Sequence, residues 1–107
     1  MSHPVNTFRK IFAINAITIF MEAKNYATIL DVRTPEEFDG EHYPGAINIP
    51  CEQVAQRIKE FEKMPKPIIA YCRTGNRSGL AVSILKQAGI TEAFNVGSLE
   101  DFKQKMR

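Results

Sequence analysis

The chain has 107 residues, the size of one domain, because two domains of half that length would each be too small to bury a core. Hydrophobic residues make up 44% and charged residues 24%, which is typical of a folded protein and excludes a disordered one. The net charge of +2 and the two cysteines argue against a nucleic-acid-binding surface, a disulfide framework and a zinc site, so we expect a single domain over residues 1–107.

Two interpretations are open for the first part of the chain. Residues 8–13 form a predicted strand, and Asn15 caps a predicted helix that runs to Lys24. Alternatively, the basic pair Arg9 and Lys10 before the apolar residues 11–21 is typical of a signal peptide, although no convincing cleavage site follows. No apolar stretch approaches the ~18 residues of a membrane span. We therefore expect a cytoplasmic protein that has no membrane partner.

Four further apolar runs predict strands. They are residues 27–32, 46–49, 68–71 and 93–96. Helical patterns separate them, and alternation of strand and helix is typical of a parallel sheet. We therefore expect an α/β fold with a mainly parallel central sheet of about five strands, including residues 8–13, and helices on both faces. Ligands bind beyond the carboxyl ends of such strands, and Cys72 lies at one of these ends.

Capping signals and apolar spacing predict the later helices. Thr34, Pro35 and Glu37 form the start of a short helix with a capping box, and Gly40 suits a left-handed stop. Apolar spacing predicts the other three. The first has an apolar face at Val54, Ile58 and Phe61. The second starts near Ser78 and ends at Gly89, and its apolar face is Leu80, Ala81, Ile84, Leu85 and Ala88. The third has a cap at Ser98 and an apolar face at Leu99, Phe102 and Met106.

The loop that follows residues 68–71 is the candidate site. Its backbone N–H groups and the amino end of the next helix favour an anion, and Gly75 and Asn76 tolerate the unusual backbone angles of a tight turn. Arg73 and Arg77 add two positive charges. A free cysteine is only about 3% thiolate at pH 7, and this environment stabilises the thiolate of Cys72. The alternative is a buried, unreactive cysteine, which such polar neighbours disfavour.

Three segments of the chain resemble the single-domain rhodaneses, which are thiosulfate sulfurtransferases. They are residues 31–38 (DVRTPEEF), 42–50 (HYPGAINIP) and 72–78 (CRTGNRS). The resemblance covers nearly the whole chain, from about Phe8 onward, and implies a rhodanese-like fold. Four residues separate Cys72 from Arg77, whereas related phosphatases and arsenate reductases have five, which widens the loop to admit a phosphate-sized group. The spacing therefore favours sulfur transfer.

The resemblance implies a role for each residue of the loop. Cys72 takes a sulfur atom from thiosulfate or a related persulfide and passes it to cyanide or a thiol. The substrate-binding residues are Arg73, Thr74, Gly75, Asn76, Arg77 and Ser78. A thioredoxin-like or other sulfur-accepting protein is a further candidate acceptor, and we expect no metal and no cofactor. A phosphatase or arsenate reductase, and a non-catalytic module that carries a persulfide or docks a partner, are the alternative functions.

Four residues outside the loop are expected to have mainly structural roles. Asp31 is expected to support the loop and His42 to stabilise a turn. Arg33, in the same supporting motif, is expected to be solvated, with a place at an anion-attracting rim as the alternative. Cys51 is expected to be a small buried side chain; the alternative is a thiol that attacks the persulfide of Cys72 or forms a disulfide with it.

Overall fold

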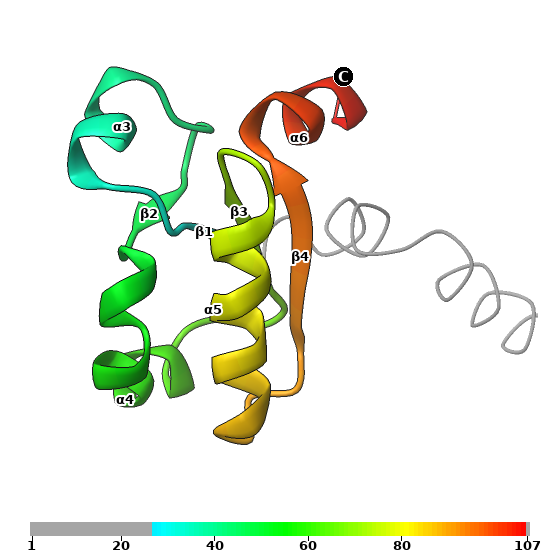
Figure 1. Cartoon of the computed structure of the whole chain (residues 1–107). Coiled ribbons are helices and arrows are strands. Elements are labelled where there is room, and N and C mark those ends of the chain that lie inside the picture. Colours follow the sequence, from blue (N-terminus) through cyan, green and yellow to red (C-terminus); the bar gives the residue numbers. More distant parts are fainter. Residues whose placement is uncertain (1–26, 107) are drawn as a thin grey trace, which may run out of the picture.

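The computed structural model describes residues 27–106 (Figure 1). The predicted strand at residues 8–13, the predicted helix up to Lys24 and the signal-peptide interpretation lie outside the described residues.

The described strands form one parallel sheet in the order β2-β1-β3-β4. Their bounds are Thr28–Asp31 (β1), Ile47–Asn48 (β2), Ile68–Cys72 (β3) and Ala93–Ser98 (β4). All five residues of β3 are buried, as expected for a central strand covered on both faces. The register pairs Asp31 with Tyr71 and Cys72 with Ser98, so the ends of β1, β3 and β4 lie side by side. The four parallel strands, alternating along the chain with helices, confirm the predicted α/β fold.

Helices cover both faces of the sheet. Their bounds are Pro35–Gly40 (α3), Ile58–Glu62 (α4), Asn76–Gln87 (α5) and Leu99–Lys105 (α6). Side chains alternate along β3: Ala70 packs with residues of α4 and α5, whereas Tyr71 packs with residues of α3 and α6. Two apolar clusters therefore hold the helices to opposite faces. Figure 1 shows α3, α6 and the β3–α5 loop together at the carboxyl end of the sheet.

The capping signals locate three helix boundaries correctly. Thr34 Oγ1 accepts a hydrogen bond of 3.1 Å from the Glu37 N–H, and Ser98 caps α6. Gly89 has a φ of +95° just after α5. The predicted left-handed stop at Gly40 is wrong, because Gly40 is the last helical residue and the chain leaves α3 through an extended Glu41.

Two predicted helices differ from the observed ones. The segment before α4 forms two 3₁₀ turns, Cys51–Gln53 and Ala55–Arg57. With three residues per turn, Cys51 and Val54 lie on the same side of the segment, and both are buried. Helix α5 begins at Asn76, two residues before the predicted start. Leu80 is 57% exposed and Ala88 is also exposed, so the predicted apolar face is wrong at both positions. The buried face of α5 contains Ser78, Ala81, Val82 and Leu85 instead.

Candidate active site

The loop between β3 and α5 turns sharply at Gly75. This residue has a φ of +98°, and a Cβ atom there would lie 3.3 Å from the Cα of Gly97. The positive φ favours glycine, and the close approach leaves little room for a side chain. Asn76, predicted to share the unusual backbone angles, is the first residue of α5. The turn places the start of α5 directly beyond the end of β3, where Cys72 lies.

Hydrogen-bond donors surround the sulfur atom of Cys72. The side chain is fully buried, and its Sγ accepts a hydrogen bond of 2.9 Å from the Gly75 N–H and one of 3.3 Å from the Ser78 hydroxyl. Burial raises the pKa of the Cys72 thiol, but the Ser78 hydroxyl and the backbone N–H groups of Ser78, Gly75 and Thr74 outweigh it, so the pKa lies below its ordinary value. The loop thus stabilises the thiolate.

The two loop arginines point to Glu37 on α3. Arg77 Nη1 and Nη2 lie 2.9 Å and 3.2 Å from the two Glu37 carboxylate oxygens, and Arg73 Nη1 lies 3.9 Å from one of them. The Arg73 side chain is 77% exposed. Hydrogen bonds from Ser78, Gly75 and Thr74 make the largest contributions that lower the Cys72 pKa, whereas the charges of Arg73 and Arg77 had also been expected to stabilise the thiolate.

Asn95 on β4 holds the Cys72 loop in place through hydrogen bonds to Gly75 and Ser78. Its Nδ2 donates to the Gly75 carbonyl at 3.0 Å, and its Oδ1 accepts from the Gly97 N–H at 3.0 Å and from the Ser78 hydroxyl at 2.7 Å. The Ser78 hydroxyl has one hydrogen and three acceptors within reach: Asn95 Oδ1 at 2.7 Å, the Gly75 carbonyl at 3.2 Å and Cys72 Sγ at 3.3 Å. Asn95 was not predicted as a site residue; an amide within an otherwise apolar strand is the signal that would have identified it.

Asp31 lies in a buried polar network next to the loop. Its carboxylate accepts hydrogen bonds from Arg33 Nε at 2.9 Å and from the Tyr71 hydroxyl at 2.7 Å. The Tyr71 hydroxyl in turn accepts from the Tyr43 N–H at 3.0 Å. Arg33 is only 7% exposed, so the expectation of a solvated side chain is wrong: the buried carboxylate holds it inside. The network anchors β3 one residue before Cys72.

His42 and Cys51 lie outside this network. The His42 ring stacks on Phe38 at a centroid distance of 3.7 Å, and its Nδ1 donates to the Phe38 carbonyl at 2.7 Å. These contacts brace the turn after α3. Cys51 is buried, and its thiol donates to the Arg77 carbonyl at 3.3 Å. Both cysteines are free thiols.

Removing the Ser78 hydroxyl is expected to make the thiol less acidic. Ser78→Ala removes a donor to the sulfur, so the Cys72 pKa should rise and the thiolate should need a higher pH to form. The rate of Cys72 alkylation by iodoacetamide, measured against pH and mapped to its peptide, should reach half its maximum at a higher pH than in the wild type. Ser83→Ala, at an exposed position of the same helix, is the control. Identical profiles for Ser78→Ala and the control would contradict this role.

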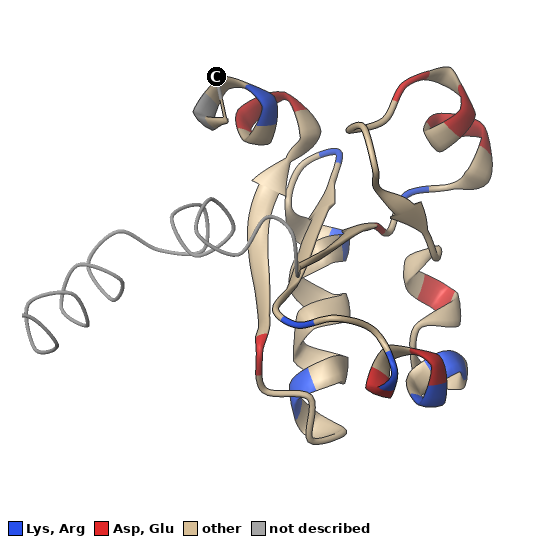
Figure 2. Cartoon of the chain, turned by 180° about the vertical axis from the view of Figure 1, so that it is seen from behind, with Lys and Arg blue, Asp and Glu red and all other residues tan. Residues whose placement is uncertain are grey.

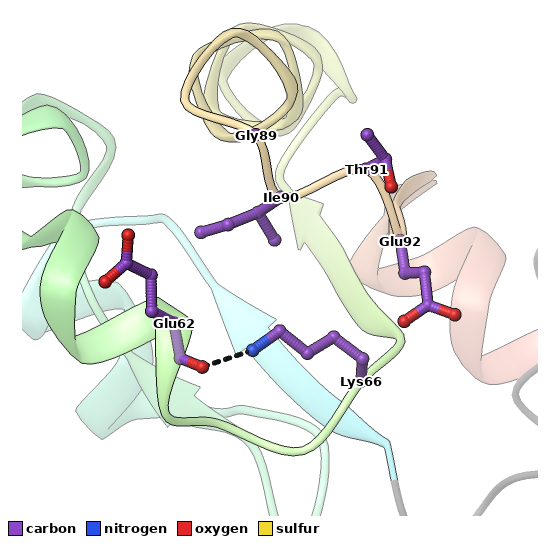
Figure 3. A pocket seen from close by; sticks show the side chains of 6 residues that line it. All are labelled: Glu62, Lys66, Gly89, Ile90, Thr91 and Glu92. Carbon is purple, nitrogen blue, oxygen red and sulfur yellow. Dashed lines mark hydrogen bonds between the residues drawn. The ribbon is translucent and has the colours of Figure 1, made fainter.

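A separate pocket of about 380 Å³ lies at the other end of the sheet (Figure 3). Glu62, Lys66 and Glu92 are among its lining residues. The Lys66 ammonium group donates to the carbonyls of Phe61 and Glu62 at the end of α4, which explains its position structurally. The pocket includes no residue of the Cys72 loop.

The part of the chain that the structure describes places the Cys72 thiol in an anion-stabilising loop. Within residues 27–106 no group of three or more His, Cys, Asp or Glu side chains is arranged to hold a metal ion. In the same range no helix is both long enough and apolar enough to cross a membrane. The hydrogen-bond donors around Cys72 Sγ can stabilise a nucleophilic thiolate, and the same loop can attract a small anionic group.

Known proteins are similar to this chain in sequence. The profile of the family described as "Rhodanese-like domain" matches residues 19–105. Thiosulfate sulfurtransferase PspE of Escherichia coli (strain K12) is 41% identical over 73 residues, which are 67% of this chain and 70% of that protein. Protein YqhL of Bacillus subtilis (strain 168) is 44% identical over 70 residues, which are 65% of this chain but only 55% of the relative's length.

Solved structures agree with these relatives. A rhodanese with anions from E. coli superposes with a TM-score of 0.64 at 39% identity and covers 70% of this chain and 89% of its own. A rhodanese-related protein from Thermoplasma volcanium gives a TM-score of 0.70 at 30% identity over 83% of this chain and 88% of its own.

Proposed function

Because this chain belongs to the rhodanese-like domain family, we propose that it is a sulfurtransferase in which Cys72 carries the transferred sulfur as a persulfide. The observation that carries the proposal is the contact between Cys72 and its own loop: the Gly75 N–H donates to Sγ at 2.9 Å. A sulfur anion at this position is already solvated by the protein, so little reorganisation is needed during the reaction.

The proposed reaction has two steps. The Cys72 thiolate attacks the outer sulfur of thiosulfate or of a related persulfide donor. A sulfur–sulfur bond forms, the donor's own sulfur–sulfur bond breaks, and its electron pair leaves with sulfite or with the donor thiolate. In the second step, cyanide or a thiolate attacks the outer sulfur of the Cys72 persulfide, and the electron pair of that bond returns to Cys72. The products are thiocyanate or a new persulfide, together with the free thiolate.

The other loop residues assist these steps. The backbone N–H groups from Arg73 to Ser78 stabilise the charge on the outer sulfur, as an oxyanion hole does for oxygen. Arg73 and Arg77 attract an anionic donor, and Gly75 permits the turn. Thr74 and Asn76 are exposed at the rim of the loop, where an acceptor must approach. The acceptor in the cell is a thiol, either of a small molecule or of a sulfur-accepting protein such as one of thioredoxin type.

Incubation of the reduced protein with thiosulfate tests this function. Intact mass is expected to show the addition of one sulfur atom, peptide mapping should place it on Cys72, and cyanide should remove it as thiocyanate. An alkyl persulfide serves as a second donor. Hydrolysis of an aryl phosphate without sulfur uptake would instead identify a phosphatase. Uptake of sulfur without transfer to cyanide or to any thiol would identify a carrier, and no uptake from either donor would refute the proposal.

A further inference from the structure

Glu37 connects helix α3 to the candidate active site. Its carboxylate closes the capping box of α3 by accepting from the Thr34 N–H at 2.9 Å. The same carboxylate binds Arg77 through both oxygens, at 2.9 Å and 3.2 Å, and lies 3.9 Å from Arg73. One acidic side chain therefore interacts with both guanidinium groups of the loop.

This carboxylate is ionised at every pH at which the protein would be assayed. The hydrogen bonds from Arg77 and from the Thr34 backbone lower the pKa of Glu37 to about 2. Figure 2 shows the acidic colour on α3 and the basic colour in the loop that follows β3. Because Glu37 cancels part of the positive charge of Arg73 and Arg77, the loop attracts a second negative charge on a ligand only weakly.

We propose that Glu37 is a specificity-determining residue that favours sulfur donors with a single negative charge, such as thiol persulfides and thiosulfonates, over dianions such as thiosulfate. The inference rests on the proposed function and identifies the charge class of its donor. Glu37 acts before the chemical step, because it changes the attraction of the donor to the arginines and does not contact Cys72.

The effect should depend on the charge of the ligand. The repulsion between Glu37 and a bound anion is proportional to the anion's charge, so removing the carboxylate charge should change the logarithm of the affinity twice as much for a dianion as for a monoanion. Pairs of partly exposed charges typically interact by less than about 1 kcal/mol. An affinity gain of about threefold for a monoanion, which equals about 0.7 kcal/mol, lies within this range, and the square of that factor, about tenfold, is expected for a dianion.

The test uses Glu37→Gln, because glutamine also closes a capping box and so removes the charge with little effect on α3. Glu36→Gln is the matched control: it removes one exposed negative charge from the same helical turn. Sulfate and methanesulfonate are titrated into isotopically labelled protein, and the backbone amide NMR signals of residues 73–78 report binding. The expected gain for Glu37→Gln is about tenfold for sulfate and about threefold for methanesulfonate.

Kinetics provide the second measurement. For Glu37→Gln, KM for thiosulfate should fall by about the same tenfold and KM for methanethiosulfonate by about threefold, with kcat nearly unchanged for both donors. Thermal unfolding of each variant checks that the fold is intact.

Three results would overturn the inference. They are equal gains for dianion and monoanion, an equal gain in the Glu36→Gln control, and a change confined to kcat. The proposed function fails in a different way: wild-type protein would bind the anions with the expected charge dependence on Glu37 but would take no sulfur from any donor.

Discussion

Cys72→Ser is expected to abolish sulfur transfer. A serine hydroxyl is not ionised near neutral pH, and it cannot form a persulfide, so both proposed steps lose their nucleophile. In an assay of thiocyanate formation with methanethiosulfonate as donor, the rate should fall by a factor on the order of 10³ or more. The mass of the treated variant should also remain that of the untreated protein.

The second cysteine provides the control for this experiment. Cys51→Ser keeps a donor for the Arg77 carbonyl, and Cys51 makes no hydrogen bond to Cys72 that the structure describes. Its thiocyanate formation should stay within a few-fold of the wild-type rate. Sulfur that accumulates on Cys51 in the Cys72→Ser protein, or full activity of that protein, would contradict the role assigned to Cys72.

Asp31→Ala is expected to have the largest effect on stability. It leaves the guanidinium group of Arg33 buried without its carboxylate and removes the acceptor of the Tyr71 hydroxyl. Breaking a buried ion pair by removing one partner typically costs about 3–5 kcal/mol. The free energy of unfolding, measured in urea, should fall by that amount, and Asp31→Asn should lose less because its amide oxygen still accepts a hydrogen bond.

Asp39→Asn on helix α3 is the control for the Asp31 variants. Asp39 is exposed, so its loss should change the free energy of unfolding by less than about 0.5 kcal/mol. An Asp31→Ala protein within about 1 kcal/mol of the wild type would show that the buried pair contributes little. If Asp31→Ala does not fold, Asp31→Asn decides the question, since it too should be less stable than the Asp39→Asn control.

The strands, and the position of Cys72 at the end of one of them, were predictable because they depend on local signals. A continuous apolar run followed by Cys72 and a glycine-containing turn indicates a buried strand that ends at a site. The capping box at Thr34 and Glu37 is equally local, and the structure contains it. The loop-supporting role expected for Asp31 stays a prediction, although its buried network with Tyr71 lies where such support is needed.

The remaining features depend on tertiary contacts that no local pattern contains. The ion pair between Glu37 and Arg77 joins residues 40 positions apart, so the contact of Glu37 with the Cys72 loop could not be predicted from the sequence. Arginine is usually found at the surface, and the buried carboxylate of Asp31 explains why Arg33 is buried. Leu80 is apolar but lies about 200° around α5 from Ser78, on the side away from the sheet.

A crystal structure of the protein after treatment with a sulfur donor tests the central claim most directly. The account predicts a second sulfur atom bonded to Cys72 Sγ, within hydrogen-bond distance of the backbone N–H groups of residues 73–78. Cys51 should be unmodified in the same crystal. An unmodified Cys72 in protein shown by mass to carry sulfur, or an outer sulfur that points away from these N–H groups, would contradict the account.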